Sequence, residues 1–206
     1  MHIVDGALSV PVLAAGAVLS VIGVAIGLKK MDYDHLPQVG VLSAAFFIAS
    51  YIHLPIGFSS VHLILNGLIG IALGWAAFPA MLVALFLQAV FFGFGGFVVL
   101  GVNAVNIALP AVLMFYICRF GISSPSPKIA ALWGAIGGAG SIVLTTVMVA
   151  FSLMLSGDAF LLAAKTTFVA HIPVMIVEGF VTAAAVLLMR KVKPEFLGID
   201  EDRAYG

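Results

Sequence analysis

Residues 9–30 read SVPVLAAGAVLSVIGVAIGLKK, a run of apolar and small residues closed by two lysines. A helix needs about 20 apolar residues to cross a bilayer, and residues 9–28 supply that length. Ser9 can cap the helix, and Pro11 lies in its first turn, where a missing N–H costs little. Because cytoplasmic loops are rich in Lys and Arg, Lys29 and Lys30 predict a cytoplasmic end for this helix and an external amino terminus.

The composition of the whole chain agrees with this segment. Of its 206 residues, 63% are hydrophobic and 9% are charged, whereas soluble domains are about 25% charged and about 45–50% apolar. The chain is therefore expected to be a polytopic membrane protein embedded in the lipid bilayer. Its formal net charge is zero, so neither nucleic acid nor an acidic substrate is indicated as a partner.

Six more apolar segments follow the first, and together they predict an all-α protein with about seven transmembrane helices. The expected segments lie at about 37–54, 60–74, 79–92, 103–122, 128–155 and 159–193. Pro110 predicts a kink or a late start in one segment, and Pro173 predicts a bend in another. Residues 1–193 are expected to form a single membrane-embedded domain, and residues 194–206 a polar cytoplasmic tail.

The charged residues support an orientation with the amino terminus outside and the carboxyl terminus in the cytoplasm. Of the nine Lys and Arg residues, all except Lys165 fall in predicted cytoplasmic loops or in the tail. The histidines are distributed the other way: His35 alone is predicted inside, and the outer half holds His2, His53, His62 and His171. Four imidazoles at the outer mouth of an apolar protein indicate a site that faces the exterior.

The first six residues, Met1-His2-Ile3-Val4-Asp5-Gly6, offer a set of metal donors. A histidine second from a free amino terminus presents three nitrogens in a row. The Met1 α-amine and the His2 backbone amide close a five-membered chelate ring, and that amide and the His2 imidazole Nδ1 close a six-membered one. Planar nitrogen ligation is typical of Ni(II) and Cu(II), with Co(II) as a third candidate, and it leaves one corner open. The alternative is a Met-His terminus that arises by chance.

The stretch SSVHLILNG, residues 59–67, contains the preferred fourth ligand, His62. Ser59 or Ser60 is expected to cap a helix, with His62 in its first turn and Asn66 one turn further along the same face. The alternative for His62 is a hydrogen-bonded histidine at the membrane interface. Asn66 is expected to bond between helices, and Ser60 is a further candidate for closing the site.

Four polar residues of later segments are candidates for supporting the ligands. His171 and Glu178 lie seven residues apart, two turns along one helical face. An ionisable residue within a transmembrane segment is costly, so this pair forms either a network that supports the metal ligands or a purely structural bond. Glu178 is expected to lie too deep to bind the metal itself. Asn103 and Asn106 could close the site from a loop, or could simply pack in a glycine-rich turn.

Several motifs of the chain match one family. The amino-terminal MHIVDG resembles the start of the CbiM/NikM proteins, together with three further stretches: SVHLILNG at 60–67, LGVN at 100–103, and AHIP at 170–173 with Glu178-Gly179. These proteins are the substrate-binding membrane subunits, or S components, of energy-coupling-factor (ECF) transporters for cobalt and nickel. The resemblance extends from Met1 to about residue 193.

The resemblance implies seven helices and an amino terminus tucked into an outward-facing site, in a protein of the prokaryotic cell membrane. It implies that the transported substrate, Ni(II) or Co(II), is held by the Met1 amine, the His2 amide and imidazole, and His62. The implied partners are a transmembrane coupling protein, cytoplasmic ATPase subunits and often a small accessory membrane protein. In such subunits an Ala-x-x-x-Ala face meets the coupling protein, and Ala45 and Ala49 have that spacing.

The chain departs from the family in a loop that contains Gly-His-Gly-Gly in many relatives. Phe94 replaces that histidine here, so a role of such a residue in closing the site is not implied. The chain also has no GxxxxGK[ST] phosphate loop, and it is expected to be non-catalytic, with ATP hydrolysed by its partners. The alternatives are a stand-alone metal channel or secondary transporter, which predicts more intramembrane acids than Glu178, and a serine hydrolase that uses Ser60.

Overall fold

The computed structural model describes residues 2–51, 53–56, 59–157 and 161–199. These residues form seven α-helices and one short hairpin. The helices are α1 (Val10–Lys30), α2 (Leu36–Ala49), α3 (Asn66–Leu73), α4 (Ala77–Phe92), α5 (Leu100–Ile122), α6 (Pro127–Met154) and α7 (Leu161–Val192). In the hairpin β1 (His53–Ile56) pairs antiparallel with β2 (Ser59–His62). The 3-10 turns of the described chain are η1 (Tyr33–His35), η2 (Gly74–Ala76) and η4 (Pro194–Leu197).

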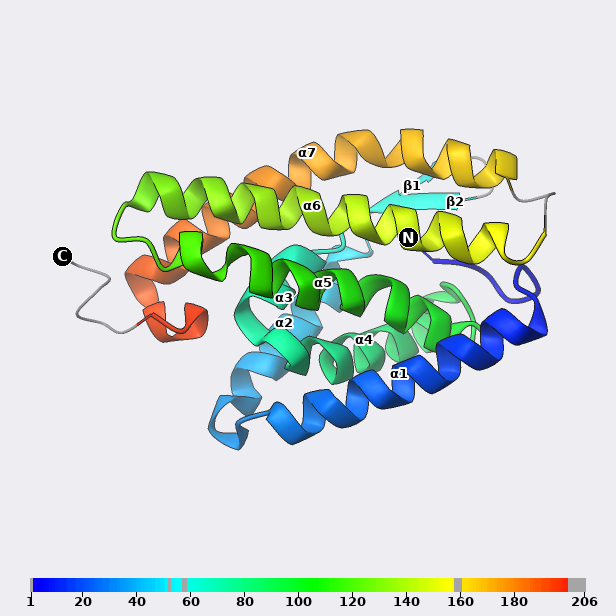
Figure 1. Cartoon of the computed structure of the whole chain (residues 1–206), viewed down its shortest axis with the longest axis horizontal. Helices are drawn as coiled ribbons and strands as arrows, with labels where there is room; N and C mark the ends of the chain where they lie inside the picture. The colour runs from blue at the N-terminus through cyan, green and yellow to red at the C-terminus, as the bar shows by residue number, and fades with distance from the viewer. Residues whose placement is uncertain (1, 52, 57–58, 158–160, 200–206) are drawn as a thin grey trace.

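The long helices form an elongated bundle, with α6 and α7 side by side along one edge and α1 along the opposite edge (Figure 1). Helix α3 lies inside the bundle, where it contacts α5, α6 and α7 and is buried from Asn66 to Ile71. One end of the bundle carries the α1–α2 and α5–α6 connections (Figure 1). The opposite end, called here the outer end, carries the start of α1 and the α4–α5 loop (Figure 1).

Five stretches of the described chain are long and apolar enough to cross a membrane: Val10–Lys30, Asn66–Phe92, Leu100–Ile122, Pro127–Met154 and Lys165–Val192. Helices α3 and α4 count as one of these stretches because η2 joins them without a break. Many large apolar side chains on the outside of the bundle are exposed, as expected for a surface that faces lipid. Seven separate crossings and the direction of insertion stay predictions.

The hairpin corrects two expectations from the sequence. The predicted helix at 60–74 begins only at Asn66, so Ser60 and His62 lie on a strand rather than in a first helical turn. The predicted helix at 37–54 ends at Ala49, and His53 pairs in β1 directly opposite His62. The physical reason is a distant acceptor: the Glu178 carboxylate of α7 bonds the backbone N–H groups of Ile64 and Leu65, so these two groups are satisfied without a helix.

Smaller expectations were met in part. Ser9 occupies the N-cap position of α1 without a capping side-chain bond, and Pro11 lies in the first turn. Helix α5 begins at Leu100, before the expected start, and continues through Pro110. The Gly134 and Gly138 pair allows α6 to approach α7 closely, since a side chain at Gly138 would overlap the Glu178 carbonyl. After α7, the chain turns back through η4 and buries Ile199 against the bundle.

Candidate metal site

The amino-terminal segment is held at the outer end by one asparagine of α5. The Ile3 N–H donates to Asn103 Oδ1 over 3.1 Å, and Asn103 Nδ2 donates to the Ile3 carbonyl over 3.0 Å. Both partners are buried, with side chains 5% and 3% exposed for Ile3 and Asn103. Asn103 therefore fixes the backbone next to His2. It does so from the first turn of a helix and not from a loop, which corrects the sequence-based expectation.

Asp5 makes a second attachment of the same segment. Its Oδ1 accepts the Val99 N–H over 3.0 Å, at the N-cap position of α5. A carboxylate is favourable there because the first N–H groups of a helix lack intrahelical partners. Gly96, at φ +154°, packs so closely that a side chain would overlap the Asp5 carboxyl group. No sequence pattern indicates this contact, because its partner is a backbone amide.

His62 is presented by β2 and is almost completely buried, with 2% exposure. Its Nδ1 lies 2.8 Å from the Leu63 carbonyl oxygen. A carbonyl can only accept a hydrogen bond, so Nδ1 carries the proton and Nε2 carries the lone pair. Fixing one ring nitrogen in this way is how proteins orient a histidine that binds metal through the other.

The rings of His2 and His62 meet in the folded chain. Their centroids lie 5.0 Å apart and the ring planes differ by 22°, although 60 positions separate the two residues in sequence. Phe94 from the α4–α5 loop stacks on His2 at 5.8 Å and 24°. A side chain at Gly95, the next residue of this loop, would lie 3.5 Å from the His2 Cβ. The loop thus covers His2 with an aromatic ring.

Burial keeps His2 in the form that binds metals. The pKa of its imidazole is well below the ordinary value, chiefly because burial disfavours the charged ring. A neutral imidazole is the ligand form of histidine. The His2 Nε2 atom is buried and has no hydrogen-bond partner among the described residues.

The chain between His62 and α3 is anchored by Glu178. Its Oε1 accepts the N–H of Leu65 over 2.7 Å and also the N–H of Ile64. Leu65 adopts a left-handed conformation with φ +57°, rare for a side chain of this kind. The carboxylate therefore holds a strained turn immediately after His62.

Comparisons with known proteins agree with this geometry. The chain matches the family of cobalt uptake substrate-specific transmembrane regions, CbiM, over residues 2–196. It belongs to the CbiM family. A provisionally named metal transport protein of Haemophilus influenzae is 42% identical over 207 residues, covering 98% of this chain and 99% of that one.

Two further proteins are similar to this chain. The fused nickel transport protein NikMN of Rhodobacter capsulatus is 39% identical over 115 residues, which cover 53% of this chain and 33% of that protein. A crystal structure described as a transition metal transporter is 28% identical, covers 93% of both chains and has a TM-score of 0.76. As a CbiM-family chain with several apolar helices, the protein is a multi-pass membrane protein of a prokaryotic cell.

The other site candidates lie in several places. Asn66 is buried and joins three helices: it donates to the Ile107 carbonyl and to Thr145 Oγ1 and accepts from Ser141. His171 is fully buried in α7, where its Nδ1 donates to the Thr167 carbonyl over 2.6 Å. Met1 lies outside the described residues, and of Ser60 the structure describes only the backbone, in β2.

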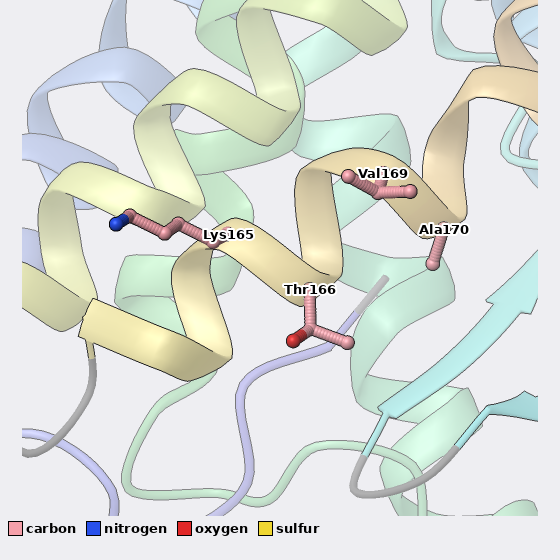
Figure 2. Close-up of a pocket in the computed structure, with 4 residues that line it drawn as sticks. All are labelled: Lys165, Thr166, Val169 and Ala170. Atoms are coloured by element: carbon pink, nitrogen blue, oxygen red, sulfur yellow. The ribbon is translucent and has the colours of Figure 1, made fainter.

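No group of three or more His, Cys, Asp or Glu side chains among the described residues could hold a metal ion. A site built on the amino terminus needs only two such side chains, because an amine and a backbone amide supply the other nitrogens. A cavity of about 390 Å³ opens elsewhere, on the outer half of α7. Figure 2 shows its lining residues, Lys165, Thr166, Val169 and Ala170, which include neither an imidazole nor a carboxylate. This cavity is therefore a poor metal site.

Proposed function

We propose that the chain is the substrate-binding membrane subunit of an energy-coupling-factor uptake transporter for Ni(II) or Co(II). The substrate is held by the Met1 amine, the His2 amide nitrogen, His2 Nδ1 and His62 Nε2. The observation that carries the proposal is the meeting of the half-buried His2 ring and the buried His62 ring at 5.0 Å, at the outer end. Residues 1–193 act as one membrane-embedded unit, and residues 194–206 lie on the cytoplasmic side.

The chemistry of these donors selects the substrate class. A plane of nitrogens that includes a deprotonated amide is favourable for Ni(II), and Co(II) is accepted by similar nitrogen ligands. The His62 tautomer directs a lone pair from Nε2, and the lowered pKa of His2 keeps that ring neutral. The His2 imidazole is therefore ready to bind a metal without first losing a proton, and the neutral His62 ring presents Nε2.

The metal site is tested by loading the purified full-length protein with Ni(II) or with Co(II) alone. We expect one metal per chain and an absorption spectrum typical of planar nitrogen ligation. His62→Ala should lose most of the binding, because it removes a ligand, whereas the exposed His35 offers a matched control, and His35→Ala should bind as the unmodified chain does. Equal affinity in the two variants would contradict the proposed ligand set.

Transport requires partners, since the sequence contains no phosphate-binding loop of its own. We place a transmembrane coupling protein, cytoplasmic ATPase subunits and in some systems a small accessory membrane protein around this subunit. The chain itself is not an enzyme: it binds the metal, and the partners hydrolyse ATP. The fused architecture named for the nickel transport relative supports a multi-component system.

The coupling face is proposed on α2, where Ala45 and Ala49 lie one turn apart and are partly exposed. Small residues allow another helix to approach closely. Replacing both by Leu should abolish metal uptake and co-purification with the coupling protein while leaving metal binding intact. Ala25, exposed on α1, offers a control for a leucine added on another helix. Normal transport by the α2 double variant would place this face elsewhere.

A further inference from the structure

Glu178 is the single acidic residue within helices α1 to α7. Its side chain is completely buried. Oε1 accepts two backbone N–H groups, and Oε2 is buried without a hydrogen-bond partner among the described residues. Two donors on one oxygen favour the ionised carboxylate and burial opposes it, so a negative charge here needs a compensating partner, and half of the bonding capacity of the group is unused.

No salt bridge joins a Lys or Arg side chain of the described chain to this carboxylate. Arg190, on the same helix, is 12 residues away, about 18 Å at the rise of an α-helix. Its guanidinium donates instead to the carbonyls of Ile122 and Pro125. Lys165, on the other side along α7, is exposed. A buried charge without a partner is costly, and proteins keep such groups paired with an opposite charge or a metal.

The proposed metal site lies next to this carboxylate. Glu178 bonds the N–H groups of Ile64 and Leu65, and two peptide units limit the His62 backbone to about 10 Å from it. His62 is itself 2% exposed, so little water intervenes to screen the two groups. A divalent metal bound to a single deprotonated amide keeps one positive charge, which is the sign and magnitude that a lone carboxylate can balance.

We propose that Glu178 is the counter-ion of the metal centre as well as the anchor of the turn after His62. This inference rests on the function proposed above. Its ionised carboxylate compensates the net charge of the loaded, water-poor site and so favours a divalent cation over the empty state. Glu178 acts through charge and through the His62 turn and does not bind the metal.

The two roles of Glu178 can be separated by Glu178→Gln. Glutamine keeps a carbonyl-type oxygen that can accept both N–H bonds, but it carries no charge. If Glu178 were only an anchor, this variant would bind metal as well as the unmodified protein. As a counter-ion, it should bind Ni(II) and Co(II) about 10–100-fold more weakly, the range found when groups that support metal ligands are changed.

The experiment uses full-length protein in lipid nanodiscs with NiCl2 or CoCl2 as the probe. Affinity and melting temperature are measured for the unmodified chain, Glu178→Gln, and Glu195→Gln as a control that loses the same charge at an exposed position. We expect metal-free Glu178→Gln to melt at or above the temperature of the unmodified chain, because a buried uncompensated charge is gone. Its stabilisation by Ni(II) should be smaller, and Glu195→Gln should show neither effect.

Unchanged Ni(II) affinity in Glu178→Gln would overturn the proposal that Glu178 is the counter-ion of the metal centre. If that variant does not fold, infrared difference spectra of the unmodified protein with isotope-labelled glutamate decide the question. Ni(II) loading should perturb an ionised carboxylate band, and a protonated carboxyl band in the loaded protein would overturn the proposal. Loss of the metal site itself is a separate result: it requires that the unmodified chain fails to bind, or that His62→Ala binds equally well.

Discussion

His2 and His62 reach the same point from supports of different kinds. His2 follows a chain end that is attached to the first turn of α5 by Asn103 and Asp5. His62 precedes a turn that Glu178 of α7 holds from inside the bundle. Asp5 is exposed, and Gly95 and Gly96 of the loop beside it have positive φ angles. Glu178 is fully buried.

The difference indicates which half of the site moves. The attachments of the amino-terminal segment lie at the outer end and are hydrogen bonds made by Asn103 and Asp5 at the start of α5. The turn after His62 leads directly into α3, which is buried among α5, α6 and α7. We therefore expect metal to enter and leave by displacement of the amino-terminal half, with the His62 half as a fixed base.

The largest effect is expected from blocking the terminal amine. Acetylation of Met1 removes one donor nitrogen and leaves His2 and His62 in place, so Ni(II) affinity should fall by more than about 100-fold, beyond the loss typical of supporting groups. Titration calorimetry on the acetylated and free proteins measures this change. Addition of one residue before Met1 moves the histidine to position 3, and any remaining capture of Ni(II) should then no longer depend on His62. Full transport by either protein would falsify an amino-terminal site.

Releasing the amino-terminal segment from α5 should have the next largest effect on Ni(II) affinity. Asn103→Leu removes both bonds to Ile3, and we expect Ni(II) affinity to fall by about 10–100-fold. Asn106→Leu is a matched control one turn along α5, because Asn106 is equally buried but bonds Ser152 of α6. That control should lower the melting temperature without changing metal affinity. A greater loss of Ni(II) affinity in Asn106→Leu would show that the bonds between Asn103 and Ile3 do not control metal binding.

Closing the loop over the terminus depends on one glycine. A side chain at Gly96 would overlap the Asp5 carboxyl group, and its φ of +154° also disfavours other residues. Gly96→Ala should therefore weaken Ni(II) binding by several-fold, through loss of the Asp5 contact with Val99. Gly93→Ala is the control: its φ is also positive, but a side chain there meets nothing within 4 Å. Similar affinity in both variants would mean that backbone strain, and not the Asp5 contact, matters.

The two halves also differ in how far the sequence could predict them. The long apolar helices and the candidate ligands follow from local pattern, because a twenty-residue apolar run and a second-position histidine are each visible in a short stretch. The hairpin was missed because the acceptor for Ile64 and Leu65 lies on α7, more than 100 positions away. Asp5 was missed because its partner is a backbone N–H, which has no sequence signature. Asn103 was found by its polarity, but its helical setting was not.

The smallest expected effect is that of acidic pH on the attachment of the amino-terminal segment. Burial lowers the pKa of His2 in the folded chain, whereas a released terminus titrates near the ordinary value of about 6.5. The released state thus binds more protons at mildly acidic pH. The free energy that holds the amino-terminal segment in place is therefore fully present above about pH 6.5 and decreases as the pH falls below that value. Each pH unit should then favour release by up to about tenfold, until the folded pKa is reached.

Hydrogen exchange of the metal-free protein measures this release residue by residue. The amides of Ile3 and Val99 report on the moving half, because their bonds are to Asn103 and Asp5. The amide of Leu65 reports on the fixed half, because its bond is to Glu178. After correction for intrinsic exchange rates, protection at Ile3 and Val99 should fall between pH 7.5 and 5.5 and stay constant at Leu65, and His2→Asn should remove the pH dependence. A parallel loss at all three amides would mean that acid loosens the whole outer end, and the two halves would then move as one body.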